Sequence, residues 1–86
     1  MYEIRLEKHA KKDLEKVLSS PLKKQLYALL EILEENPYAP PYEKLFGDLE
    51  GLYSRRLNIQ HRLVYRVDEE KKAVVILRMW THYGDN

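Results

Sequence analysis

Four of the six arginines of this 86-residue chain fall within twelve positions. They are Arg55, Arg56, Arg62 and Arg66. No Asp or Glu occurs between Gly51 and Val67, so nothing nearby in the sequence neutralises them. Guanidinium groups present forked N–H donors that match phosphate oxygens, so this cluster is typical of a phosphate-binding surface. A strand surface that contacts only water is the alternative interpretation.

The apolar residues around this cluster predict how it folds. Those expected to face the core are Tyr53, Leu57, Leu63, Tyr65 and Val67. This alignment centres a hairpin near Ile59 and places Arg56 opposite Arg62, on the side of the sheet that no helix covers. Like charges at opposed positions cost roughly a few tenths to 1 kcal/mol. An anion bound between the two guanidinium groups would offset that cost.

The end of the chain adds a second group of candidate residues. Arg78, Trp80 and His82 share one side of the last predicted strand if its pairing is regular, which would join a cation, an aromatic ring and a titratable imidazole. For Trp80, packing in the core is the alternative, and for His82 a solvent-exposed chain end. Glu43 is a candidate base, although most single surface glutamates only aid solubility.

Metal and cofactor chemistry have no motif here. The chain contains no cysteine, and His9 and His61 lack a carboxylate or second histidine at ligand spacing. Neither a Gly-rich phosphate loop nor a nucleophile elbow is present. We therefore expect no metal and no cofactor.

Apolar periodicity predicts the order strand, helix, helix, strand, strand, strand. Residues 2–6 alternate apolar and charged side chains, which is the period of a half-buried strand, and helical spacing begins at Lys8. The apolar side of this first helix is expected to hold Ala10, Leu14, Val17 and Leu18, and its charged outer face Lys11, Lys12, Asp13, Glu15 and Lys16.

The rest of the chain divides at its prolines and polar turns. Ser20-Pro21 predicts the start of a second helix, and Asn36-Pro37 its end. Its apolar stripe is predicted to contain Leu22, Leu26, Leu29, Leu30 and Leu33. Residues 38–42 are expected to form an irregular surface connection. The remaining strands are predicted over residues 52–59, 61–67 and 73–80.

Composition limits the class of protein. A chain that is 44% hydrophobic and 34% charged, with a net charge of +1, has the composition of a globular domain and not of a disordered segment. Its size allows one modest core with about 64% of the unfolded surface buried, so we expect one domain over residues 1–86. No apolar run approaches a membrane span, and we expect a soluble, cytoplasmic protein.

Three sequence blocks, in this order and at this spacing, resemble a known family. Residues 49–56 (LEGLYSRR), 61–65 (HRLVY) and 81–83 (THY) are similar to the YoeB/Txe toxins of the RelE superfamily. The resemblance implies an α+β fold, with two N-terminal helices packed on one face of a twisted, mainly antiparallel four-stranded sheet. It also implies a type II toxin that enters the ribosomal A site, cleaves the bound messenger RNA and is neutralised by a YefM/Axe-like antitoxin. A homodimer is a further option.

The resemblance also implies a set of site residues. The implied catalytic residues are Glu43, Arg56, Arg62, His82 and Tyr83, and the residues expected to bind RNA are Arg55, Arg66, Arg78 and Trp80. In the implied metal-free reaction, the 2′-hydroxyl of the RNA attacks the adjacent phosphorus. Glu43 suits the base and His82 the acid, the two arginines hold the phosphate, and Tyr83 orients or donates.

Some residues depart from the family pattern. The chain continues past His-Tyr through residues 84–86, Gln60 replaces a common acid, and Tyr53 replaces a frequent tryptophan. The choice of Glu43 depends on an ungapped count back from Arg56, so another base stays open. Two other functions also stay open: a ParE-like inhibitor of DNA gyrase that cuts no RNA, and a plain RNA-binding module.

Overall fold

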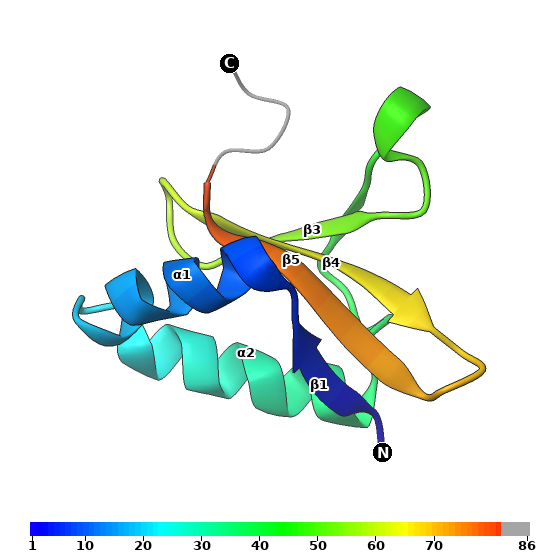
Figure 1. The fold of residues 1–86 in the computed structure, drawn as a ribbon, viewed down its shortest axis with the longest axis horizontal. Helices are drawn as coiled ribbons and strands as arrows, with labels where there is room; N and C mark the ends of the chain where they lie inside the picture. Colours follow the sequence, from blue (N-terminus) through cyan, green and yellow to red (C-terminus); the bar gives the residue numbers. More distant parts are fainter. Residues whose placement is uncertain (82–86) are drawn as a thin grey trace.

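A computed structural model describes residues 1–81 of the chain. In this part, two helices and five strands follow one another along the chain (Figure 1). They are β1 (Glu3–Leu6), α1 (Lys8–Leu18), α2 (Lys23–Glu35), β2 (Glu43–Lys44), β3 (Tyr53–Arg56), β4 (Arg62–Asp68) and β5 (Ala73–Thr81), with a short 3₁₀ turn at Gly47–Leu49. Neither helix is long and apolar enough to cross a membrane.

The strands form one mixed sheet in the order β1-β5-β4-β3-β2. β1 runs parallel to β5, and the other neighbours are antiparallel, so the predicted α+β class and mainly antiparallel sheet are confirmed. The predicted count of four strands is wrong by one. The additional strand, β2, has two residues and is too short to show an alternating pattern in the sequence.

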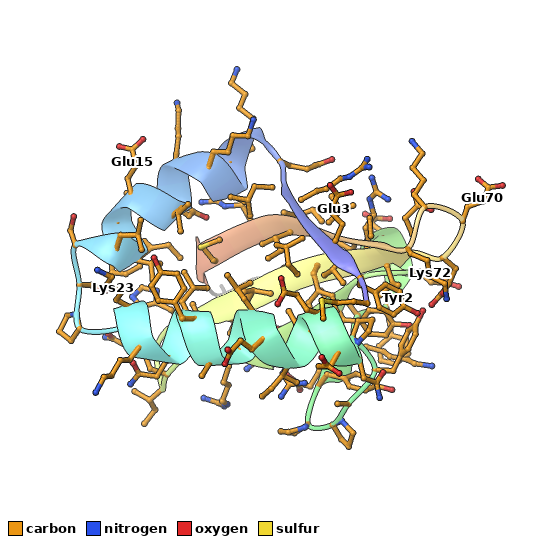
Figure 2. The ribbon with its side chains drawn as sticks, turned by 90° about the horizontal axis from the view of Figure 1, so that it is seen from below. Tyr2, Glu3, Glu15, Lys23, Glu70 and Lys72 are labelled. Atoms are coloured by element: carbon orange, nitrogen blue, oxygen red, sulfur yellow. The ribbon has the colours of Figure 1, made fainter. Side chains whose placement is uncertain are left out.

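Both helices lie against the same face of the sheet, as the sequence predicted. Figure 2 shows α1 and α2 in front of β4 and β5. Their apolar stripes pack on the inward side chains of the strands, and this burial is the main source of stability. The core contains Ala10, Val17, Leu22, Leu26, Leu29, Leu33, Leu57, Leu63, Tyr65, Val74, Ile76 and Met79.

The Ser20 hydroxyl bridges the turn between α1 and α2. The Ser20 hydroxyl donates to the Val17 carbonyl at 2.8 Å and accepts from the Leu22 amide at 3.1 Å, and the helix then begins at Lys23. The predicted start at Ser20-Pro21 is therefore early by two to three residues. The helix ends at Glu35, before the Asn36-Pro37 pair, as predicted.

Asp13 corrects the prediction for α1. It was expected on the charged outer face, but it is only 2% exposed. It lies three residues after Ala10 and four before Val17, which is the spacing of the buried face. Its carboxylate accepts from the Arg78 side chain and from the Met79 amide, so its burial is compensated. Leu18, expected inside, is 38% exposed.

Candidate functional site

The β3–β4 hairpin has the register that the sequence predicted. Tyr53 pairs with Tyr65, and Arg56 pairs with Arg62. This alignment puts two guanidinium groups at directly opposed positions of the sheet. The pairing of Arg56 with Arg62 defines the centre of the candidate site.

Hydrogen bonds turn these two arginine side chains in opposite directions. Arg62 Nε donates to Ser54 Oγ at 2.5 Å, and Arg62 Nη2 donates to a carboxylate oxygen of Glu43. Arg56 Nη1 donates to the carbonyl of Ile59, in the hairpin loop, at 3.4 Å. Arg62 therefore leans toward β2 and Arg56 toward the loop, which reduces the repulsion between them.

The short strand β2 brings Glu43 to these arginines. Glu43 pairs with Ser54 of β3, and Ser54 pairs on its other side with Val64 of β4. The Glu43 side chain is 67% exposed, whereas the Arg62 side chain is 13% exposed. A solvated carboxylate thus lies beside a largely covered cation, and three strands contribute to the contact.

A groove of about 270 Å³ opens beside this contact. We call it the Glu43 groove, and its lining residues are Leu29, Pro41, Tyr42, Glu43, Ser54, Arg55, Arg56 and Arg62. Three of the five predicted catalytic residues, Glu43, Arg56 and Arg62, meet here. The groove thus joins two cations with one carboxylate, a combination that can hold an anion next to a base.

The segment before Glu43 is anchored to the sheet at several points. Tyr65 donates its hydroxyl to the Pro37 carbonyl at 2.8 Å, and Arg55 donates to the Ala39 carbonyl. Burial raises the pKa of Tyr65 to about 12, although the nearby charge of Arg55 opposes this shift. The Tyr42 ring packs edge to face on Tyr53 with centroids 5.2 Å apart. These contacts fix the chain that leads into β2.

A further anchor joins this segment to the β4–β5 turn. The hydroxyl groups of Tyr2 and Tyr38 both donate to the Glu69 carboxylate, the first at 2.9 Å, and Lys72 Nζ lies 3.2 Å from it. Figure 2 shows Tyr2 beside Lys72 at this edge. The hydrogen bonds from Tyr38, Tyr2 and Lys72 hold the pKa of Glu69 below its usual value.

Two of the arginines expected to bind RNA lie in different environments. Arg55 is 7% exposed, and it lines the groove while its guanidinium is used by the Ala39 carbonyl. It occupies the same side of β3 as Tyr53, which is the side that faces the core. Arg66 is exposed, and its Nη2 lies 3.9 Å from a carboxylate oxygen of Glu7, outside the groove lining.

The structure does not bring Arg78 or Trp80 to the Glu43 groove. Two register shifts interrupt the β4–β5 ladder between Arg62 and Tyr65, so the pairing of the last strand is not regular. Arg78 lies two residues after the core residue Ile76, on the side of β5 that α1 covers. Arg78 Nε reaches Asp13 of α1 at 2.9 Å. Trp80 stacks on His61 with ring centroids 4.0 Å apart and packs against the core, which is the alternative that the sequence left open.

Some site predictions fall outside the described residues. His82, Tyr83 and residues 84–86 belong to this group. β5 ends at Thr81, which pairs with Arg62. The last described residue of the chain is therefore a strand neighbour of the groove.

Sequence reasoning did not single out Ser54. The signal was present in the register, because Ser54 lies diagonal to Arg62 across the β3–β4 pair and shares its face. A hydroxyl at that position is within reach of a long side chain on the neighbouring strand.

Comparisons with known proteins agree with this fold. Residues 22–83 match the model of the family described as the YoeB-like toxin of bacterial type II toxin-antitoxin systems. A comparison with curated protein sequences gives no match.

Several solved structures are similar over almost the whole chain. A YoeB/ParE toxin from Agrobacterium tumefaciens is 25% identical, with a TM-score of 0.86 over 94% of this chain and 99% of that one. The YoeB-YefM complex from Staphylococcus aureus gives 31% identity and a TM-score of 0.80, over 96% of this chain and 99% of that one. The toxin-antitoxin complex RelBE2 from Mycobacterium tuberculosis gives 33% identity and a TM-score of 0.69, over 94% and 98%.

The fold is thus that of RelE-superfamily toxins. This chain belongs to the YoeB-like toxin family of bacterial type II toxin-antitoxin systems.

Proposed function

We propose that this toxin is a ribosome-dependent messenger-RNA endoribonuclease that inhibits translation. The observation that carries the proposal is the meeting of Arg56, Arg62 and Glu43 at one groove. Two arginines that line one groove suit the binding of a phosphodiester, and a solvated carboxylate beside them suits a base.

The proposed reaction needs no metal ion. Glu43 takes the proton from the 2′-hydroxyl, and the 2′-oxygen forms a bond to the adjacent phosphorus. The bond from phosphorus to the 5′-oxygen breaks, and His82 supplies the proton that this leaving oxygen needs. The products are a 2′,3′-cyclic phosphate and a free 5′-hydroxyl. Arg56 and Arg62 stabilise the charge that builds up on the phosphorane, and Tyr83 orients or donates.

Substrate binding would also release the base. In the free protein, Glu43 is engaged by Arg62. The carboxylate end of this ion pair is exposed, so a phosphate can take over the Arg62 donors and leave the Glu43 carboxylate to water. Glu43 then becomes available beside the 2′-hydroxyl.

The ribosome would supply what a small domain lacks. The Glu43 groove of about 270 Å³ contacts only a short stretch of RNA, too few groups to align the attacking and leaving oxygens. Messenger RNA held in the A site arrives already oriented. This proposal implies a cytoplasmic site of action.

We propose a cognate antitoxin as the second partner. The Staphylococcus aureus relative is a YoeB-YefM complex, and another structure from that organism is a YoeB dimer. The exposed arginines of this region, Arg56 and Arg66, favour an acidic, partly disordered segment that folds as it binds. A homodimer is a further assembly that sedimentation of the isolated toxin would detect.

Cleavage on programmed ribosomes tests the catalytic proposal. We expect rapid cleavage of A-site messenger RNA, slower cleavage of naked RNA by orders of magnitude, and none where the attacking 2′-hydroxyl is replaced by hydrogen. Equal rates on naked and ribosome-bound RNA would contradict ribosome dependence.

A second assay addresses the gyrase alternative, because the name of the Agrobacterium tumefaciens relative includes ParE. Inhibition of DNA supercoiling without RNA cleavage would favour a ParE-like inhibitor. A plain binding module would be favoured by two results together: the wild type binds RNA but does not cleave it, and Glu43→Ala binds RNA equally well.

A further inference from the structure

Ser54 is a buried polar residue under the candidate site. It is 1% exposed, and its Oγ accepts from Arg62 Nε at 2.5 Å. The reaction proposed above gives it no role. When an arginine binds a phosphate, a buried hydroxyl that is hydrogen-bonded to its guanidinium controls the direction in which the guanidinium points.

The sheet register explains why Arg62 meets this hydroxyl. Ser54 lies between Glu43 on β2 and Val64 on β4. Arg62 starts on β4, passes over Ser54 and ends at Glu43, so its side chain crosses β3. Ser54 is thus the midpoint of a path across three strands, and only a small residue leaves room for the guanidinium above it.

Two contacts fix the plane of the guanidinium group. Nε donates to Ser54, and Nη2 donates to Glu43. The contact with Glu43 is exposed and is displaced when a phosphate binds in the proposed reaction, whereas the contact with Ser54 is buried. After displacement, the bond to Ser54 is the one that still holds Arg62 in place.

We propose that Ser54 is a positioning residue that holds Arg62 in the orientation needed to bind the scissile phosphate. This inference rests on the proposed nuclease function. Nε is used by Ser54, so the terminal Nη1 and Nη2 groups turn toward the phosphate. Preorganisation of this kind matters most in the transition state, so loss of the hydroxyl should lower kcat more than it raises KM.

The first test replaces the hydroxyl. Ser54→Ala should slow single-turnover cleavage on ribosomes about tenfold to a hundredfold, with ribosome affinity unchanged, since small misplacements near reacting atoms carry costs of this size. Ser54→Cys keeps the size of the side chain but accepts hydrogen bonds weakly, so it should show a similar loss while folding normally. Full activity in both variants would overturn the proposal.

Ser20 provides a matched control, because it is also a hydrogen-bonded serine but lies in the turn between α1 and α2. Ser20→Ala should lower the thermal unfolding midpoint without changing the rate of cleavage. If Ser20→Ala slowed cleavage as much as Ser54→Ala, the slower cleavage would result from reduced protein stability, and the positioning role of Ser54 would be wrong.

Double variants test whether Ser54 acts through Arg62. In an Arg62→Ala background, Ser54→Ala should cause no further loss, because the group it positions is gone. In an Arg56→Ala background, the two losses should multiply. Multiplication in both backgrounds would show that Ser54 acts independently of Arg62 and would contradict the proposal.

A measurement without RNA separates this inference from the proposed function. The Arg62 Nε–H proton should give a resolved, slowly exchanging NMR signal in the wild type and a rapidly exchanging one in Ser54→Ala. If the wild type showed the protected signal but cut no RNA, the nuclease proposal would fail while the positioning of Arg62 by Ser54 would hold. An unprotected signal in the wild type would overturn the positioning role itself.

Discussion

Asp13 and Arg78 lie 65 positions apart in the chain and form an ion pair, with Arg78 Nε 2.9 Å from Asp13 Oδ2. The same carboxylate oxygen accepts from the Met79 amide at 3.0 Å. The pair joins α1 to β5 near the register shifts of the β4–β5 ladder. It therefore stabilises the irregular end of the strand that runs to Thr81.

Removing this carboxylate should destabilise the protein. Asp13→Ala removes a buried carboxylate that accepts from the Met79 amide and the Arg78 guanidinium, which should lower the free energy of unfolding by roughly 2–4 kcal/mol. For a domain of this size, that is a decrease of at least about 8 °C in the thermal unfolding midpoint. Lys12→Ala, at the exposed neighbouring position, is the control and should change the midpoint little. Equal midpoints for both variants would show that the pair contributes nothing.

The same pair predicts how stability depends on pH. Burial raises the pKa of Asp13, but the hydrogen bonds from Arg78 and the Met79 amide, with the Arg78 charge, lower it more, so the net pKa lies below the ordinary 3.8. The stabilisation is therefore complete above about pH 4 and is lost as the pH falls through the lower pKa of the folded state.

A variant without the titrating group tests this pH dependence. Asp13→Asn should be less stable than the wild type near pH 7, and the difference should shrink as acid protonates Asp13. Chemical denaturation at a series of pH values measures it. A difference that stayed constant from about pH 7 to the acid limit of folding would contradict the assignment.

The core register could be predicted from the sequence because side chains alternate with a period of two along a strand. Placing Tyr53 and Leu63 inside left one alignment, and that alignment paired Arg56 with Arg62. Arg55 lies two residues after Tyr53 on the same strand, so the same alternation puts it on the inner side, although arginine side chains are usually exposed.

Other features depend on contacts that local patterns do not contain. The burial of Asp13 requires a partner from β5, and Arg78 supplies it from the side of β5 that also carries the core residues Val74 and Ile76. β2 exists because Glu43 meets Ser54, not because two residues form a strand pattern. These features arise from tertiary contacts, which override local propensity.

Arg55 should act mainly as a structural anchor. Its guanidinium is buried and donates to the Ala39 carbonyl, in the segment that leads to Glu43. Arg55→Met should lower the free energy of unfolding by about 1–3 kcal/mol, because the partly buried Ala39 carbonyl loses a charged donor. Arg66→Met removes an exposed arginine and should change stability by less than about 0.5 kcal/mol. Comparable stability of the two variants in urea denaturation would contradict the anchor role.

Arg56 should matter for the reaction and little for the fold. Within residues 1–81 its guanidinium makes a long hydrogen bond to the Ile59 carbonyl, and removal of Arg56 relieves a like-charge pair with Arg62. Arg56→Ala should therefore keep or slightly raise the thermal midpoint. In the proposed reaction it should lose roughly 3 kcal/mol of transition-state stabilisation, about a hundredfold in single-turnover rate. A variant that unfolds earlier but cleaves normally would reverse this assignment.

A modified substrate should separate the proposed acid from the proposed base. His82→Ala and Glu43→Ala should each slow single-turnover cleavage by roughly a hundredfold to ten-thousandfold, the usual range for a positioned acid or base. If sulfur replaces the leaving 5′-oxygen, the expelled thiolate needs no proton, so cleavage by His82→Ala should recover while cleavage by Glu43→Ala stays slow. Recovery of Glu43→Ala alone would reverse the two roles, and normal rates in both variants on the unmodified substrate would place the catalytic groups elsewhere.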